Sequence, residues 1–251
     1  MDIVLIGTGN VASVLGRKIR EAGHHIIQIY GRNASAASEL AYEWDTESTN
    51  YKSLITQNAD LYIVAVPDDA IDEVVADLRF PGKVVAHTAA AVSMEVLRPV
   101  SAHIGVIYPL QSLRKEMSYL PEIPLYFEVN DERAKKTLAK LAGSISSGEL
   151  KQAGGEERLK LHVAAVVVSN FTNHLYALAE EYCRKESVDF RQLIPLIEET
   201  AKRVREVSPS VSQTGPAVRN DGETISKHLA LLEQHPKLKE LYLAFTRSIQ
   251  H

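Results

Sequence analysis

A glycine-rich turn near the start of the chain has the residue types and the spacing of a phosphate-binding site. Gly7-Thr8-Gly9-Asn10-Val11-Ala12 fits the pattern G-x-G-x-x-G/A and lies between a short apolar run and an amphipathic stretch. The first glycine permits a tight turn, the second lets the backbone approach a pyrophosphate, and a small third residue lets a helix pack closely on a strand. The helix would offer free N–H groups to the phosphates. We therefore predict a dinucleotide site at Gly7, Thr8, Gly9, Asn10 and Val11, with a purely structural turn as the alternative.

The end of the second apolar run lacks the acidic residue that usually binds the ribose 2′-hydroxyl of NAD. The sequence there is Tyr30-Gly31-Arg32-Asn33-Ala34-Ser35. Arg32 can stack on adenine or pair with a 2′-phosphate, and Asn33 can donate a hydrogen bond to the same phosphate. The pattern favours NADP as cofactor, while an ordinary exposed loop arginine is the alternative.

Three further strand ends should face the same cleft, because ligands bind outside the carboxyl ends of strands in open α/β sheets. Val66-Pro67 follows one strand, and we predict that both residues line the cofactor. His87-Thr88 follows the next strand, and Tyr108 to Ser112 follow the one after it. We expect His87 to be a hydrogen-bonded interior histidine.

A long helical stretch carries the candidate catalytic residues. Leu161 to Val168 is apolar almost all round, which is typical of a buried helix. At about 3.6 residues per turn, His162 and Ser169 fall in one narrow sector and Asn170 lies at its margin. An imidazole titrates near working pH, so we predict that His162 donates or accepts a proton. We expect Ser169 and Asn170 to orient a substrate carbonyl, with ordinary hydrogen bonding inside the protein as the alternative for any one of them.

A Gly-Pro loop near the C-terminus offers a candidate substrate contact. In the segment Gln213 to Gly222, Gly215-Pro216 fixes a turn and Arg219 could hold a carboxylate or a phosphate. A surface loop with an exposed arginine is the alternative. We predict Arg219 and Gly215 as substrate residues.

Val-, Ile- and Tyr-rich runs alternate with helical stretches up to about residue 150, which predicts an α/β Rossmann domain with a doubly wound, mostly parallel sheet. The expected strands are Asp2–Ile6, His25–Tyr30, Glu43–Asp45, Leu61–Val66, Val84–His87, Gly105–Tyr108 and Leu125–Val129. The expected helices between them are Val11–Ala22, Ser35–Glu43, Ala70–Leu78 and Ser93–Arg98.

A Gly- and Ser-rich linker is expected at Ser144–Gly155, and only helices after it. These helices are Glu156–Lys185, Asp189–Val207, Glu223–Glu233 and Pro236–Ile249. We therefore predict a dinucleotide-binding domain at residues 1–152 and an all-helical substrate and dimerisation domain at residues 153–251.

The composition excludes several classes of function. The 251 residues carry a net charge of -4 without a basic face, which argues against nucleic-acid binding. The single Cys183 allows no internal disulfide and fits a reducing compartment. No Cys and His spacing suggests a metal site. No signal peptide or membrane-spanning run is visible, so we expect a cytoplasmic protein without membrane contact.

Two groups of motifs resemble known families. The turn at Gly7 to Ala12, with Val64 to Asp68, resembles the N-terminal domain of pyrroline-5-carboxylate reductases and of coenzyme F420-dependent NADP reductases. His162 to Ala165 with Ser169-Asn170, and Thr214 to Asp221 with His228-Leu229, resemble a bacterial family that joins a Rossmann-like domain to a helical domain of unknown function. This resemblance implies a 6-phosphogluconate-dehydrogenase-like helical half and a homodimer built through its helices.

The resemblance also has a departure that bears on catalysis. The related β-hydroxyacid dehydrogenases place a catalytic lysine four residues before an asparagine on the corresponding helix, whereas Lys160 is followed by Ala164 at that spacing. The sequence therefore predicts an NADP-dependent oxidoreductase with His162 in place of that lysine. The enzyme would transfer a hydride to or from a small carbonyl, imine or hydroxy acid in the interdomain cleft. A non-catalytic NADP-binding sensor or regulator is the alternative.

Overall fold

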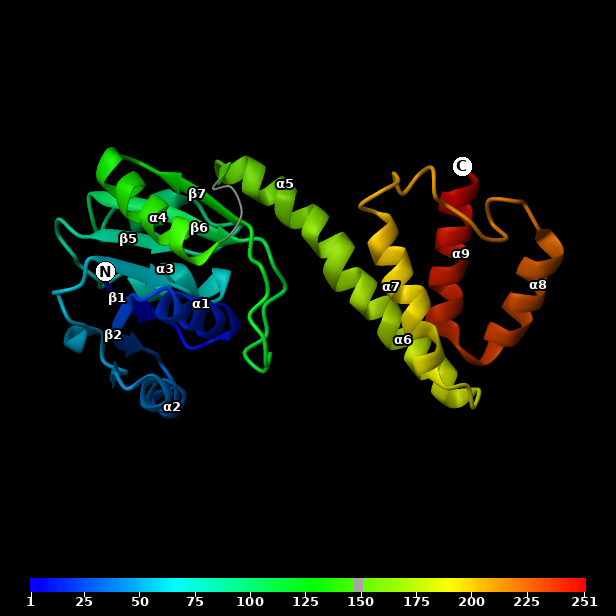
Figure 1. Ribbon diagram of the computed structural model, residues 1–251, viewed down its shortest axis with the longest axis horizontal. Helices are drawn as coiled ribbons and strands as arrows, with labels where there is room; N and C mark the ends of the chain where they lie inside the picture. Colours follow the sequence, from blue (N-terminus) through cyan, green and yellow to red (C-terminus); the bar gives the residue numbers. More distant parts are fainter. Residues whose placement is uncertain (147–150) are drawn as a thin grey trace. The chain divides into compact units, whose positions relative to one another are not determined.

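The computed structural model describes residues 1–146 and 151–251 and divides the chain into two compact units, Met1–Ser169 and Asn170–His251. The first unit is a sheet covered by helices, and the second is helical (Figure 1). The predicted boundary at residues 152/153 falls at the end of the last strand of the sheet, whereas the two units divide inside a long helix.

The first unit contains an eight-stranded sheet in the order β3-β2-β1-β4-β5-β6-β7-β8. All neighbouring strands run parallel except β6 and β7, which are antiparallel. The order reverses between β1 and β4, which is the switch point of a Rossmann sheet. The predicted fold class is confirmed. The strands are β1 (Asp2–Ile6), β2 (His25–Tyr30), β3 (Glu47–Thr49), β4 (Leu61–Val64), β5 (Val84–His87), β6 (His103–Pro109), β7 (Leu125–Val129) and β8 (Lys151–Gln152).

Helices cover both faces of the sheet, so each strand contributes to two cores. Along β1, Ile3 and Leu5 enter one core while Val4 and Ile6 enter the other, as the two-residue period of a strand requires. All four are fully buried, which explains why the sequence shows apolar runs rather than alternation. The helices of this unit are α1 (Asn10–Glu21), α2 (Ala34–Trp44), α3 (Ile71–Val75), α4 (Glu132–Ile145) and α5 (Gly155–Ala165).

Helices α1 and α2 pack closely against each other where Gly16 meets Trp44. A Cβ atom on Gly16 would lie 2.1 Å from Cη2 of Trp44, so only glycine fits at that position. Trp44 is buried, and the guanidinium carbon of Arg20 lies 5.8 Å from its ring centroid. This contact fixes the helix that begins at the glycine-rich turn.

One predicted strand is wrong, and one helix was not predicted. Glu43–Asp45 is not a strand: Glu43 belongs to α2, and Asp45 ends that helix with a left-handed φ of 51°. The strand begins two residues later, as β3, where it can pair with β2. Helix α4 was not predicted, although Asp131 caps it by accepting a hydrogen bond from the Ala134 N–H. Residues 147–150 of the predicted linker lie outside the described residues.

The long helix is continuous in sequence but not regular. Helix α5 passes into a π-helical segment, Val166–Phe171, and then into α6 (Thr172–Lys185). The expectation that this stretch is buried is wrong for the single chain, since Val163 is 59% exposed and Val168 72% exposed. An all-apolar pattern shows that a helix requires a cover, but not which molecule supplies it.

The second unit consists of α6, α7 (Ile194–Arg203), α8 (Gly222–Leu231) and α9 (Pro236–Gln250), with short 3₁₀ turns between them. Its helices lie where the sequence places them, and the segment from Ser208 to Asp221 contains no regular helix or strand. Few of its side chains are buried, and these include Leu178, Cys183 and Leu232. Among the described residues, no helix is both long and apolar enough to span a bilayer.

Candidate functional site

The glycine-rich turn lies at the switch point of the sheet. Gly7 follows β1 and has a φ of +129°, and a Cβ atom there would lie 2.2 Å from the carbonyl oxygen of Ala65, which follows β4. Gly9 precedes α1, and a Cβ atom there would meet nothing within 4 Å. The first glycine is therefore required by packing, whereas the second borders open space at the N-terminus of a helix. This is the arrangement that a bound pyrophosphate needs.

A pocket with a volume of about 290 Å³ opens at this turn. Its size is close to the lower end of ordinary ligand pockets. Asn10 and Val11, also predicted to bind the cofactor, do not line the pocket: they form the first turn of α1, and the Asn10 Oδ1 accepts a hydrogen bond from the Lys115 N–H. The lining residues are Gly7, Thr8, Gly9, Tyr30, Gly31, Arg32, Asn33, Ala65, Val66, Pro67 and Val74. The other predicted cofactor residues thus surround one pocket that fits the phosphate and ribose end of a dinucleotide.

Arg32 and Asn33 have different partners at the edge of this pocket. The Arg32 Nη1 donates to the Glu73 carboxylate over 3.3 Å, and both side chains are mainly exposed. The Asn33 Oδ1 accepts from the Ala36 N–H and so caps α2. Arg32 is the residue that could exchange its partner for a 2′-phosphate, because an exposed ion pair of this kind is weak.

A tyrosine–histidine pair lies at the same carboxyl edge of the sheet. Tyr108, near the end of β6, is 7% exposed, and its hydroxyl lies 3.2 Å from His162 Nδ1 on α5. The two rings meet edge to face, with centroids 6.3 Å apart. Burial raises the pKa of Tyr108, and the negative charge of Asp68 raises it further. The phenol therefore keeps its proton and can donate it.

Sequence reasoning placed Tyr108 at the cleft but gave it no role. The signal that could have found it is its position at the end of a central strand of a doubly wound sheet. Its contact with His162 joins segments 54 residues apart in the chain, and no local pattern shows such a contact.

The predicted alignment of Ser169 with His162 assumes a regular α-helix, but Ser169 lies in a π-helical segment. A π turn takes one residue more than an α turn, which rotates the following side chains by about 100° around the helix axis. Ser169 lies inside Val166–Phe171, so the calculation for a regular helix does not apply to it. π-helical turns occur frequently at functional sites.

The remaining predicted residues belong to the second unit. Asn170 is exposed, and so is Arg219, which follows Gly215 in the loop before α8. Gly215 has a φ of +111°, which favours glycine at this turn. Asp221 caps α8 by accepting a hydrogen bond from the Thr224 N–H over 3.1 Å. Hydrogen bonding from Thr224 lowers the pKa of the Asp221 carboxyl group. The substrate contacts of Asn170, Gly215 and Arg219 stay predictions.

Arg158 and His87 are the two fully buried polar side chains of a cluster near the end of β5. Arg158 is fully buried, forms an ion pair with Glu128 on β7 and donates to the Val92 carbonyl over 3.0 Å. His87 is also fully buried, and its Nδ1 accepts from the Ala89 N–H over 3.2 Å, in keeping with an interior histidine. Burial lowers the pKa of His87 to about 4, with a further contribution from the charge of Arg158. His87 is therefore neutral at physiological pH.

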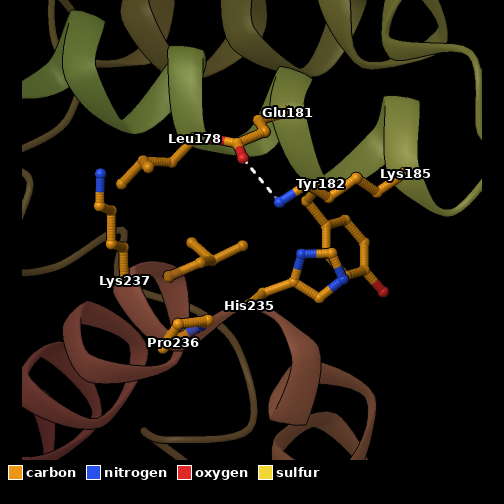
Figure 2. A pocket seen from close by; sticks show the side chains of 8 residues that line it. Leu178, Glu181, Tyr182, Lys185, His235, Pro236 and Lys237 are labelled. Carbon is orange, nitrogen blue, oxygen red and sulfur yellow. Dashed lines mark ion pairs between the residues drawn. The ribbon is translucent and has the colours of Figure 1, made fainter.

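A second pocket, of about 150 Å³, lies in the helical unit between α6 and the start of α9. Figure 2 shows Leu178, Glu181, Tyr182 and Lys185 on α6 facing His235, Pro236 and Lys237. Lys185 pairs with Glu181 over 2.7 Å, and His235 lies 2.7 Å from the Glu186 carboxylate. These internal pairings are those of a structural ion-pair cluster. In the described residues, no group of three or more His, Cys, Asp or Glu side chains could hold a metal ion.

Comparison with known families agrees with this architecture. Residues 1–111 match a Rossmann-like domain, and residues 123–249 match a domain of unknown function, DUF2520. The chain belongs to the DUF2520 family. The assignment made from the motifs, a Rossmann-like domain joined to a helical domain of unknown function, is confirmed. No functionally curated protein matches the sequence.

Solved structures of similar proteins span the whole DUF2520 chain. BF3122 from Bacteroides fragilis, a proposed NADP oxidoreductase, is 36% identical over 99% of this chain and 97% of its own, with a TM-score of 0.89. TM1727 from Thermotoga maritima is 23% identical over 99% of this chain and 98% of its own, with a TM-score of 0.79. The 1-pyrroline-5-carboxylate reductase of Streptococcus pyogenes shares the fold at 15% identity over 100% of this chain and 98% of its own, with a TM-score of 0.65.

Proposed function

We propose that this DUF2520 protein is an NADP-dependent oxidoreductase that transfers a hydride to or from a small carbonyl, imine or hydroxy acid. The observation that carries the proposal is the Tyr108–His162 pair. It lies at the carboxyl edge of the sheet, the edge at which the phosphate turn also lies. A proton donor and a dinucleotide pocket at one edge are the two parts that such a reaction requires.

The choice of NADP rests on the second strand and on the relatives. Arg32 stands at the pocket edge where an NAD-binding domain would place an acid, and its exposed pairing with Glu73 leaves it available to a phosphate. A proposed NADP oxidoreductase is 36% identical to this chain. An imine reductase from Myxococcus stipitatus, solved with NADP+, has the same fold at 15% identity.

When bound, NADP supplies or accepts the hydride, and the protein moves the proton. Tyr108 would donate its phenolic proton to the substrate oxygen or nitrogen. His162, whose imidazole is exposed to solvent, returns a proton to the phenol through Nδ1 and is reprotonated from water. We assign Ser169 and Asn170 to orienting the substrate, Arg219 to holding a carboxylate, and Gly215 to shaping the turn that presents it.

The test is NADPH oxidation with a panel of aldehydes, keto acids and cyclic imines. With an active substrate, Tyr108→Phe and His162→Gln should each lower kcat by about a hundredfold to ten-thousandfold and leave NADPH affinity unchanged. Lys160→Met is the matched control, because Lys160 is exposed on the same helix and pairs with Glu156 over 2.6 Å. Full turnover by Tyr108→Phe would contradict the proposed chemistry.

A non-catalytic NADP-binding sensor is the second candidate, and one observation favours it. Lys160 is followed by Ala164 and pairs with Glu156, so the lysine–asparagine pair of the β-hydroxyacid dehydrogenases has no counterpart at this spacing. Tight NADPH binding without oxidation by any member of the panel would support the sensor.

We also propose a homodimer joined through the C-terminal helices. The apolar surface of the long helix includes Val163, Val167, Val168 and Phe171, each more than half exposed in the single chain. Such a surface requires a cover, and a second copy presents the same apolar surface to match it. A cytoplasmic location likewise stays a prediction.

A further inference from the structure

We infer that the buried Arg158 is a positioning residue: its ion pair with Glu128 holds α5 against the sheet so that His162 meets Tyr108. This inference rests on the proposed role of the Tyr108–His162 pair. Arg158 itself is not assigned a contact with substrate or cofactor.

The first step is the set of partners that surround Arg158. Its Nη1 donates to the Glu128 carboxylate and to the Ala153 carbonyl, and its Nη2 donates to the Val92 carbonyl. Glu128 belongs to β7, Val92 follows β5, and Ala153 follows β8. One guanidinium thus connects three separate segments of the sheet to the first turns of α5. A rigid planar donor of this kind fixes its partners more tightly than a lysine could.

The second step is the geometry of α5. Arg158 and His162 are four residues apart, so their side chains lie on the same face of the helix, about 6 Å apart along its axis. Arg158 is fully buried on that face, whereas His162 reaches Tyr108 one turn later. The turn that Arg158 anchors is therefore the turn that determines where His162 lies.

The third step is the order of the strands. Strand β6, which carries Tyr108, lies between β5 and β7. Arg158 donates a hydrogen bond to the carbonyl of Val92, after β5, and forms an ion pair with Glu128 on β7. Glu128 pairs in register with Val106 of β6. Its partners therefore flank the strand on which His162 makes its contact. A shift of α5 relative to this sheet edge would separate the imidazole from the phenol.

The fourth step is the neutrality of His87. Because burial lowers its pKa to about 4, His87 carries no charge at neutral pH and adds no second cation beside Arg158. The Arg158 Nε has no hydrogen-bond partner among residues 1–146 and 151–251. Arg158 is therefore the cation of this cluster, and it pairs with the Glu128 carboxylate.

The test measures the coupling between Tyr108 and His162 without requiring turnover. In full-length protein labelled with ¹³C at histidine Cε1, the His162 resonance is the one that disappears in His162→Gln. At a fixed pH, Tyr108→Phe should shift this resonance in the parent protein. In an Arg158→Met background the same change should leave the resonance unshifted. In a Lys160→Met background the shift should be that of the parent.

The controls separate positioning from loss of folding. NADPH binding at the glycine-rich turn should be retained in Arg158→Met, because none of the Arg158 partners lines that pocket. If Arg158→Met does not fold, Glu128→Gln takes its place, since it keeps the shape of the side chain and removes the charge. A coupling as large as the parent's in either folded variant would overturn the inference. The two proposals can fail separately. If the coupling depends on Arg158 but Tyr108→Phe stays fully active, the proposed chemistry is wrong and the positioning role of Arg158 remains.

Discussion

Gly7 and Ala65 approach so closely that a Cβ atom on Gly7 would lie 2.2 Å from the Ala65 carbonyl oxygen. Gly9, two residues later, borders open space. The two glycines of one motif are therefore required for different reasons. The first closes the contact between β1 and the chain after β4, and the second leaves room for a ligand.

This difference predicts opposite phenotypes for the same substitution. Gly7→Ala combines a steric clash with a positive φ, so it should lower the free energy of unfolding by about 2 kcal/mol or more. Gly9→Ala should unfold like the parent but bind NADPH at least about tenfold more weakly. Urea unfolding and fluorescence titration measure the two effects. Parental NADPH affinity in Gly9→Ala would place the phosphates elsewhere.

Arg32 and Glu73 should set the preference between the two nucleotides. We expect NADPH to bind at least about tenfold tighter than NADH, and Arg32→Ala to remove most of that difference. Glu73→Gln frees the guanidinium from its carboxylate. Because an exposed ion pair contributes at most about 1 kcal/mol, this change should strengthen NADPH binding by no more than about fivefold and leave NADH unaffected. Equal affinities for the two nucleotides in the parent would contradict the assignment of NADP.

His87 should make the first unit less stable in mild acid. Its pKa is about 4 in the folded protein against an ordinary value of 6.5, so between these values the unfolded chain binds the extra proton. The free energy of unfolding should therefore fall as the pH drops from about 6.5 to about 4, by roughly 3 kcal/mol in all, and the effect should level off at lower pH. Above about pH 6.5, His87 should contribute no pH dependence.

The variant His87→Asn isolates this effect, since its amide oxygen can still accept the Ala89 N–H. Subtracting its unfolding free energies from those of the parent at each pH cancels the contributions of other titrating groups. A difference that does not change between about pH 6.5 and about pH 4 would show that His87 is not held neutral by burial.

The exposed face of the long helix should form the dimer contact. Light scattering should give twice the chain mass of 27.8 kDa at micromolar concentration. Val168→Glu should shift the protein toward the monomer, because Val168 is 72% exposed in the single chain and a charge would be buried by the partner. Tyr42→Glu is the control, since Tyr42 is 91% exposed on α2 and lies outside the helical half. A monomeric parent protein would rule out the homodimer.

The Rossmann-like half was predictable because its signals are local. The bounds of β1, β2, β5 and β7 follow from apolar runs that end at turn residues, and the glycine motif marks the first crossover. Glu43–Asp45 failed as a strand because a left-handed cap at Asp45 lies between the helix and β3. Local propensity does not distinguish the end of a helix from the start of a strand within one or two residues.

The candidate site was predictable only in part, because its decisive contacts are not local. His162 follows from its residue type on an apolar helix, but Tyr108 and Arg158 acquire their roles through partners 54 and 30 residues away in the chain. The role of Ser169 stays a prediction for another reason, since a π-helical turn changes the angular spacing from which its place beside His162 was calculated. Burial of the helix could not be read from its composition, since the sequence does not say what covers it.

The packing of Gly16 against Trp44 gives the protein a built-in optical reporter. Trp44 is the only tryptophan of the chain, it is buried, and it belongs to the first unit. Its emission therefore follows the unfolding of the Rossmann-like unit alone, while circular dichroism is weighted by the helices of both. Transitions that coincide by the two probes would show that the units unfold together, and separated transitions would give each unit its own stability.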